Sequence, residues 1–125
     1  PNGIALSPDE QTLYVANSDA ANMSWMAYDL DTSGASNARV FYDANDQTAP
    51  GAADGMKVDT AGNIFATGPG GVWVFDPDGS HLGTIMPGEV AANVGWGEDG
   101  RTLYMTGSTS LYRIRLETQG IIPGP

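Results

Sequence analysis

Three segments of the chain repeat one pattern: GIALSPDEQTLYVAN (residues 3–17), GMKVDTAGNIFATG (residues 55–68) and NVGWGEDGRTLYMTG (residues 93–107). Each begins with a short apolar run, passes through a turn with acidic residues and Gly or Pro, and returns in a second apolar run. Short apolar runs bounded by turn residues are typical of antiparallel β-strands. The repeats therefore predict three hairpins of the same kind.

Further apolar runs lengthen these hairpins into sheets. A third run follows each hairpin: MSWMAYDL (residues 23–30), GVWVFD (residues 71–76) and SLYRIRL (residues 110–116). A fourth follows the first two: ARVFYD (residues 38–43) and HLGTIM (residues 81–86). In GVWVFD, Val72 and Val74 alternate with Trp73 and Phe75, so both faces of the strand are apolar. This pattern is expected of a strand sandwiched between two neighbouring sheets.

The spacing of the repeats indicates a β-propeller. Their first residues stand at positions 3, 55 and 93, close to the ~40 to 50 residues of one propeller blade. We predict an all-β fold of about three four-stranded antiparallel blades within one partial domain. The approximate blades are residues 1–50, 51–90 and 91–125.

Three blades cannot close a ring. An open array leaves large apolar faces in water, and such arrays need capping or closure. The sequence therefore predicts either a fragment of a larger propeller or a chain that pairs with itself. Two copies of three blades form one six-bladed ring if they are related by twofold symmetry.

Composition excludes several classes of function. The chain has 15 acidic and 5 basic residues and a net charge of −10, which argues against nucleic acid or an anionic membrane as partner. No apolar stretch approaches the roughly 18 residues of a membrane-spanning helix. Without Cys, and with His81 in an outer turn as the single histidine, nucleophilic triads lack a general base. The compartment stays open.

Most of the acidic residues fall in predicted turns, where Asp is favoured because it bonds to nearby backbone N–H groups. We interpret most of this acidity as solvated turns. The turn acids are Asp9, Glu10, Asp29, Asp31, Asp59, Asp76, Asp78, Glu98 and Asp99.

Asn2 and Asp54 occupy the same place in successive repeats, directly before the glycine that opens the inner strand. Equivalent positions of neighbouring blades converge on the propeller axis. Amide and carboxylate oxygens are the donors that Ca²⁺ or Mg²⁺ takes. Asn-Gly and Asp-Gly are also common tight-turn dipeptides, so the residues alone leave a metal site and two turns as alternatives. The third repeat has Ala92 at this place and Asn93 one position later.

The chain resembles the gluconolactonase and regucalcin (senescence marker protein) family in three ordered motifs that cover nearly all of it. The motifs are PNGIALSPDEQTLYVANS (residues 1–18), ADGMKVDTAGNIFATGPGGVWVFDPDGSHLGTI (residues 53–85) and ANVGWGEDGRTLYMTGSTSLYRIRL (residues 92–116). The resemblance implies a six-bladed propeller. Because the ending LYRIRLETQGIIP is similar to the family's C-terminus, we expect this chain to be the C-terminal half and the N-terminal half to be missing.

The same resemblance implies one divalent cation where the inner strands begin, most often Ca²⁺, with Zn²⁺, Mg²⁺ or Mn²⁺ as alternatives. Asn2 and Asp54 match two of its ligands. Asn93 and Glu89 are weaker candidates for contacts behind the ligands or with the substrate. A glutamate and a further asparagine are expected from the N-terminal half. Since Ca²⁺ takes six to eight oxygens, we expect little activity from this chain alone.

Hydrolysis of sugar lactones is the function that the resemblance implies, with a small-molecule lactone as partner. The cation would polarise the lactone carbonyl and stabilise the oxyanion formed by water attack. Asp54 would be the catalytic residue, holding the metal and accepting a proton from the water. Two alternatives stay open: a related calcium-dependent arylesterase or organophosphatase, and a non-enzymatic calcium-binding or interaction propeller.

Overall fold

The computed structural model describes residues 1–122 and arranges them in three antiparallel sheets. We name these sheets blade 1, blade 2 and blade 3 in chain order. Blade 1 contains β1 (Ile4–Leu6), β2 (Thr12–Asn17), β3 (Ser24–Asp31) and β4 (Gly34–Asp43). Blade 2 contains β5 (Met56–Val58), β6 (Ile64–Gly68), β7 (Gly71–Phe75) and β8 (His81–Ile85). Blade 3 contains β9 (Ala91–Gly97), β10 (Thr102–Gly107) and β11 (Leu111–Arg115).

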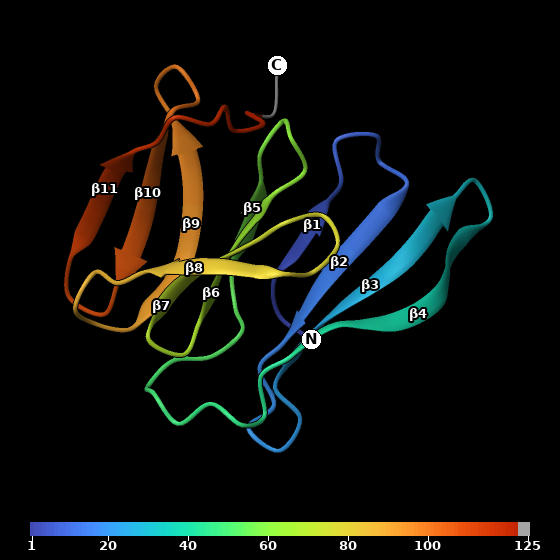
Figure 1. The fold of residues 1–125 in the computed structure, drawn as a ribbon, viewed down its shortest axis with the longest axis horizontal. Coiled ribbons are helices and arrows are strands. Elements are labelled where there is room, and N and C mark those ends of the chain that lie inside the picture. The colour runs from blue at the N-terminus through green and yellow to red at the C-terminus, as the bar shows by residue number, and fades with distance from the viewer. Residues whose placement is uncertain (123–125) are drawn as a thin grey trace.

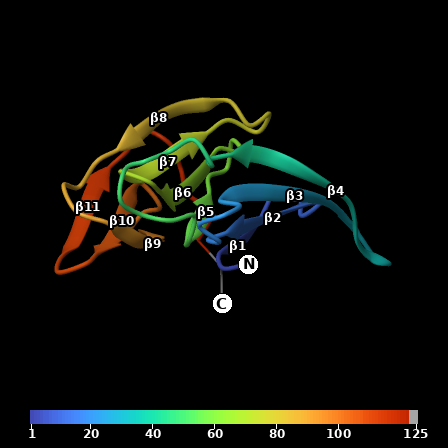
Figure 2. The same cartoon turned by 90° about the horizontal axis from the view of Figure 1, so that it is seen from below.

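Each blade is a meander whose strands lie side by side in chain order (Figure 1). Seen from below, the blades fan out, with β1, β5 and β9 on the inner side and β4, β8 and β11 at the periphery (Figure 2). The part of the chain that the structure describes contains no α-helix, and so no helix that could cross a membrane. The predicted all-β fold of antiparallel blades is confirmed.

Blade 3 has three strands where four-stranded blades are predicted. After β11 the chain turns back towards blade 2: the backbone N–H of Thr60 donates to Gln119 (2.8 Å), and that of Ile121 donates to Val58 (3.2 Å). The indole N–H of Trp96 donates to the same Val58 carbonyl (3.0 Å). The C-terminal segment therefore joins blade 3 to blade 2 instead of adding a strand. Residues 123–125 of the predicted third blade lie outside the described residues.

The hairpin turns are stabilised by their own aspartates. The carboxylates of Asp9, Asp31, Asp76 and Asp99 each accept a hydrogen bond from the backbone N–H two residues later, at 2.7 to 3.1 Å. This is the Asx-turn geometry that favours Asp at such positions. The interpretation of these acids as turn residues is confirmed.

Asp59 is an exception to the interpretation of most turn acids as solvated. Its side chain is fully buried and accepts four hydrogen bonds. Three come from its own turn: the N–H of Ala61 (3.0 Å), and the N–H and side-chain amide of Asn63 (both 2.8 Å). The fourth comes from the Thr118 hydroxyl (2.6 Å). Burial of this carboxylate is tolerated because both of its oxygens accept hydrogen bonds.

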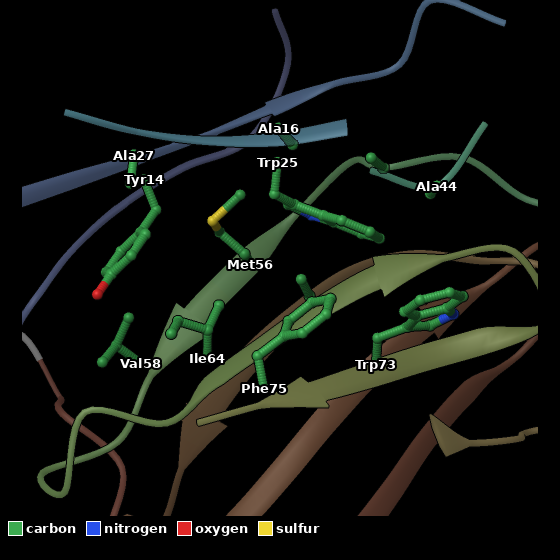
Figure 3. Close-up of a cluster of buried hydrophobic side chains, with 12 residues drawn as sticks. Tyr14, Ala16, Trp25, Ala27, Ala44, Met56, Val58, Ile64, Trp73 and Phe75 are labelled. Carbon is green, nitrogen blue, oxygen red and sulfur yellow. The ribbon is translucent and has the colours of Figure 1, made fainter. Parts of the chain in front are cut away.

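β7 packs on both of its faces and so joins all three blades. Towards blade 1, the ring of Trp25 lies 5.5 Å from that of Trp73 and 5.0 Å from that of Phe75 (Figure 3). On the opposite face, Val72 is buried with Leu103 of blade 3. Tilted and edge-on aromatic contacts of this kind add to the gain from burial. The prediction that this strand is sandwiched between two sheets is confirmed.

Replacing Phe75 with Ala is expected to lower the free energy of unfolding by about 3–5 kcal/mol, because a fully buried ring leaves a cavity. Leu82→Ala is the control: Leu82 is 61% exposed, and its loss should change stability by no more than about 0.5 kcal/mol. Urea unfolding of the intact protein, followed by tryptophan fluorescence, measures both. Equal losses in the two variants would contradict the packing described for β7.

Candidate metal centre

Asn2 and Asp54 stand at the points where the inner strands of blades 1 and 2 begin. The backbone N–H of Asn2 donates to Ala16 (2.8 Å), and that of Asp54 donates to Thr67 (3.3 Å). Both acceptors lie on the second strand of the same blade. The two residues therefore continue the ladders of β1 and β5 by two residues towards one end of the molecule.

The glycines that follow them are not turn residues. Gly3 accepts a backbone hydrogen bond from Ala16 (2.8 Å), and Gly55 accepts one from Thr67 (2.9 Å), so both pair with the second strand of their own blade. Neither has the positive φ that a type I′ turn demands. Of the two alternatives left by the sequence, the tight-turn interpretation of Asn2-Gly3 and Asp54-Gly55 is wrong.

Close approach of neighbouring blades explains the glycines instead. A Cβ on Gly3 would overlap the carbonyl oxygen of Asp54 and lie 2.8 Å from its carbonyl carbon. A Cβ on Gly55 would lie 2.8 Å from the Cα of Asn93. Only glycine lets two backbones come this close. The same contacts place the starts of the three inner strands against one another.

The Asp54 carboxylate differs from the turn carboxylates. It is half-buried, yet no residue between 1 and 122 donates a hydrogen bond to it. A carboxylate that is partly withdrawn from water and not bonded to its own backbone is available to a cation or a substrate. On the neighbouring strand, the amide nitrogen of Asn2 donates to the Ser18 hydroxyl (3.0 Å).

The donors present suit a hard cation but do not complete a site. An amide oxygen and a carboxylate are among the ligands of Ca²⁺, which takes about six to eight oxygens. Within residues 1–122, His, Asp and Glu form no group of three or more that could hold a metal. Asn2 and Asp54 by themselves offer too few oxygens for Ca²⁺.

Asn93 lies beside this pair, on the first strand of blade 3. Its side chain covers Gly55, and its Oδ1 accepts a hydrogen bond from the backbone N–H of Val94 (2.8 Å). A register shift in the β9–β10 ladder leaves Ala92 as an extra residue, whose carbonyl accepts from the N–H of Gly55 (3.1 Å). Asn93 therefore supports the strand that carries Asp54, with its side-chain oxygen already engaged.

Glu89 lies in the connection from β8 to β9, at the same end of the molecule. Its Oε2 accepts hydrogen bonds from the N–H (3.1 Å) and the hydroxyl (3.0 Å) of Thr109. Hydrogen bonding from the Tyr112 hydroxyl, and to a lesser extent from Thr109, lowers the pKa of the Glu89 carboxyl. The carboxyl therefore stays ionised at neutral pH. These contacts are all with blade 3, so the structure does not bring Glu89 into contact with Asp54.

Ser18 is a residue that the repeats and motifs of the sequence do not single out. A serine at the end of a second strand is expected to satisfy a local backbone group. Its hydroxyl instead donates to the carbonyl of Ala53 in the next blade (2.6 Å). A serine at this place in the first and third repeats, Ser18 and Ser108, is the only sequence signal for it. His81 stays apart from the inner strands, exposed and stacked on Trp73 at 4.2 Å between ring centroids.

The sequence profile of the SMP-30/gluconolactonase/LRE-like region matches residues 1–109. The chain belongs to this family. Among curated relatives, a gluconolactonase of Zymomonas mobilis is 43% identical over 127 residues, an alignment that covers 96% of this chain and 36% of the relative. A pentonolactonase of Haloferax volcanii is 38% identical over 110 residues, an alignment that covers 85% of this chain and 37% of that relative.

Solved structures of this family share the fold. A gluconolactonase from Xanthomonas campestris superposes with a TM-score of 0.82 at 34% identity, covering 93% of this chain and 38% of that one. A calcium-binding regucalcin from Agrobacterium tumefaciens superposes with a TM-score of 0.79 at 24% identity, covering 96% of this chain and 47% of that one. The chain spans just over a third of the length of the curated relatives it matches.

Gly3→Ala is expected to destabilise this SMP-30/gluconolactonase-family protein by about 1–3 kcal/mol, because the methyl group forces β1 away from Asp54. Gly95→Ala is the matched control on the inner strand β9: a Cβ there meets no heavy atom within 4 Å among the described residues. Thermal unfolding of the two variants measures the difference. A Gly3→Ala variant as stable as Gly95→Ala would contradict the close approach of the inner strands.

Proposed function

We propose that the protein to which this chain belongs is a metal-dependent hydrolase of sugar lactones. The observation that carries the proposal is the Asp54 carboxylate, half-buried and free of hydrogen bonds from residues 1–122, in a segment that packs against Gly3 just before β1. The names of the curated relatives support the substrate class, since the two described above are named gluconolactonase and pentonolactonase. They favour a lactone over the aryl ester or organophosphate alternatives.

In this proposal Asn2 and Asp54 would hold the cation, the first with its amide oxygen and the second with its carboxylate. Hard oxygen donors favour Ca²⁺, and Mg²⁺, Mn²⁺ or Zn²⁺ are the other cations to test. When bound, the cation supplies Lewis-acid polarisation of the lactone carbonyl and stabilises the negative charge that develops on its oxygen. Asp54 also accepts a proton from the attacking water at its carboxylate.

Further ligands come from outside the described residues in this proposal. Two side-chain donors leave most of the coordination of Ca²⁺ to water, which gives weak binding. We therefore expect a peptide of residues 1–125 alone to show little lactonase activity. The remaining donors belong to blades that complete the ring.

Asp54→Ala is expected to lower kcat/KM for gluconolactone by about 100-fold or more, since it removes the one charged ligand that this chain contributes. Asp78→Ala is the matched control, because Asp78 is an exposed carboxylate in the β7–β8 turn. Assays of the intact protein with and without a chelator, and after adding back CaCl₂, test the metal. Full activity in the chelated protein would overturn the metal dependence.

Closure of the array by further blades is part of the same proposal. Apolar side chains are exposed at both ends of the array: Ile4 (63%) and Leu6 (39%) in blade 1, and Leu111 (67%) and Ile114 (36%) in blade 3. Open blade faces of this kind need a covering partner. The partner is either more of the same chain or a second copy.

The intact mass of the natural protein is expected to exceed the 13.0 kDa of this chain by more than about twofold, consistent with relatives nearly three times its length. Mass spectrometry of the protein from its source measures this. A mass near 13.0 kDa with dimeric sedimentation would assign closure to a second copy. A folded monomer of that mass would contradict closure altogether.

A further inference from the structure

Ser18 makes two hydrogen bonds that connect the candidate ligands of blades 1 and 2. The side-chain nitrogen of Asn2 donates to Ser18 Oγ (3.0 Å), and Ser18 Oγ donates to the carbonyl of Ala53 (2.6 Å). Ala53 is fully buried and directly precedes Asp54. One hydroxyl thus stands between the side chain of one candidate ligand and the backbone of the other.

The single proton of the Ser18 hydroxyl decides which way the Asn2 amide points. A backbone carbonyl only accepts, so the proton of Ser18 is committed to Ala53. Towards Asn2 the hydroxyl can then act only as an acceptor, and the atom facing it has to be the NH₂ group. The Asn2 Oδ1 is consequently turned away from Ser18. The opposite amide orientation would place two acceptors against each other.

Both ends of this connection are held by other bonds. The loop after β2 is closed by the side chain of Asn17, which donates to the carbonyl of Asn22 (2.8 Å). On the other side, the backbone N–H of Asp54 pairs with Thr67 (3.3 Å), which holds the Ala53 carbonyl in place. Ser18 is therefore a fixed acceptor for Asn2 and not a mobile surface hydroxyl.

We propose that Ser18 is a positioning residue for the metal centre, which orients the Asn2 amide so that Oδ1 is presented to the cation. This inference rests on the proposed function, because it assumes that Asn2 binds the metal. Ser18 touches neither cation nor substrate in this role. It acts through Asn2, and it ties that ligand to the strand that carries Asp54.

Blade 3 provides a natural comparison. Ser108 follows β10 as Ser18 follows β2, and its hydroxyl donates to the carbonyl of Val90 (3.4 Å). The residue at the ligand position of this repeat is Ala92, which has no amide to orient. Ser108 is thus a serine in the same structural place without the proposed role, and Ser108→Ala is a matched control for Ser18→Ala.

Calorimetric titration of the chelator-stripped intact protein with CaCl₂ tests the proposal. Ser18→Ala should weaken Ca²⁺ binding about 10- to 100-fold, the usual effect of removing a partner behind a metal ligand. Ser18→Thr keeps the hydroxyl and should bind nearly as well as the wild type. Ser108→Ala should leave the Ca²⁺ affinity unchanged.

The double variant separates positioning from a general effect on folding. If Ser18 acts only through Asn2, Ser18→Ala has no further effect on Ca²⁺ affinity once Asn2 has been replaced by Ala. An equal loss in both backgrounds would overturn the proposal, as would unchanged affinity in Ser18→Ala when Asn2→Ala and Asp54→Ala both weaken binding. If neither Asn2→Ala nor Asp54→Ala weakens Ca²⁺ binding, the metal centre itself is wrong, and the role of Ser18 with it.

Discussion

The close approach of neighbouring inner strands is the constraint on which the rest of this structure depends. At Gly3 and Gly55 the backbone of one blade meets the next with no room for a Cβ. This contact brings the starts of the inner strands of neighbouring blades against one another. Candidate ligands so far apart in sequence, Asn2 and Asp54, become neighbours as a consequence of backbone packing.

Packing farther from the axis makes this approach rigid. β7 is buried on both faces, so blade 2 cannot shift against blade 1 without separating Trp25 from Trp73 and Phe75. The C-terminal segment adds a polar connection, because Thr118 donates to the buried Asp59 of blade 2. A site assembled from different blades needs such stiffness, since its ligands share no local element that could hold them together.

Polar side chains divide into two groups by what satisfies them. Turn aspartates such as Asp9 and Asp76 accept hydrogen bonds from their own backbone, and this local pairing accounts for much of the acidity. Asp54 has no such pairing within residues 1–122, and the Asn2 amide nitrogen donates to the Ser18 hydroxyl in the loop after β2. The contrast supports a ligand role for the second group, because both keep oxygens uncommitted where the inner strands converge.

The sequence by itself determined the strand pattern, the antiparallel blades and the two-sided burial of β7. These features depend on local periodicity and turn chemistry, which involve residues close together in the sequence. The family could also be recognised from the sequence, because its motifs are contiguous. Only the tertiary structure decided that Asn2-Gly3 and Asp54-Gly55 continue the pairing of β1 and β5 instead of forming tight turns, that Asp59 is buried and that Ser18 reaches Ala53. Each of these depends on contacts between residues far apart in the chain, for which no local pattern exists.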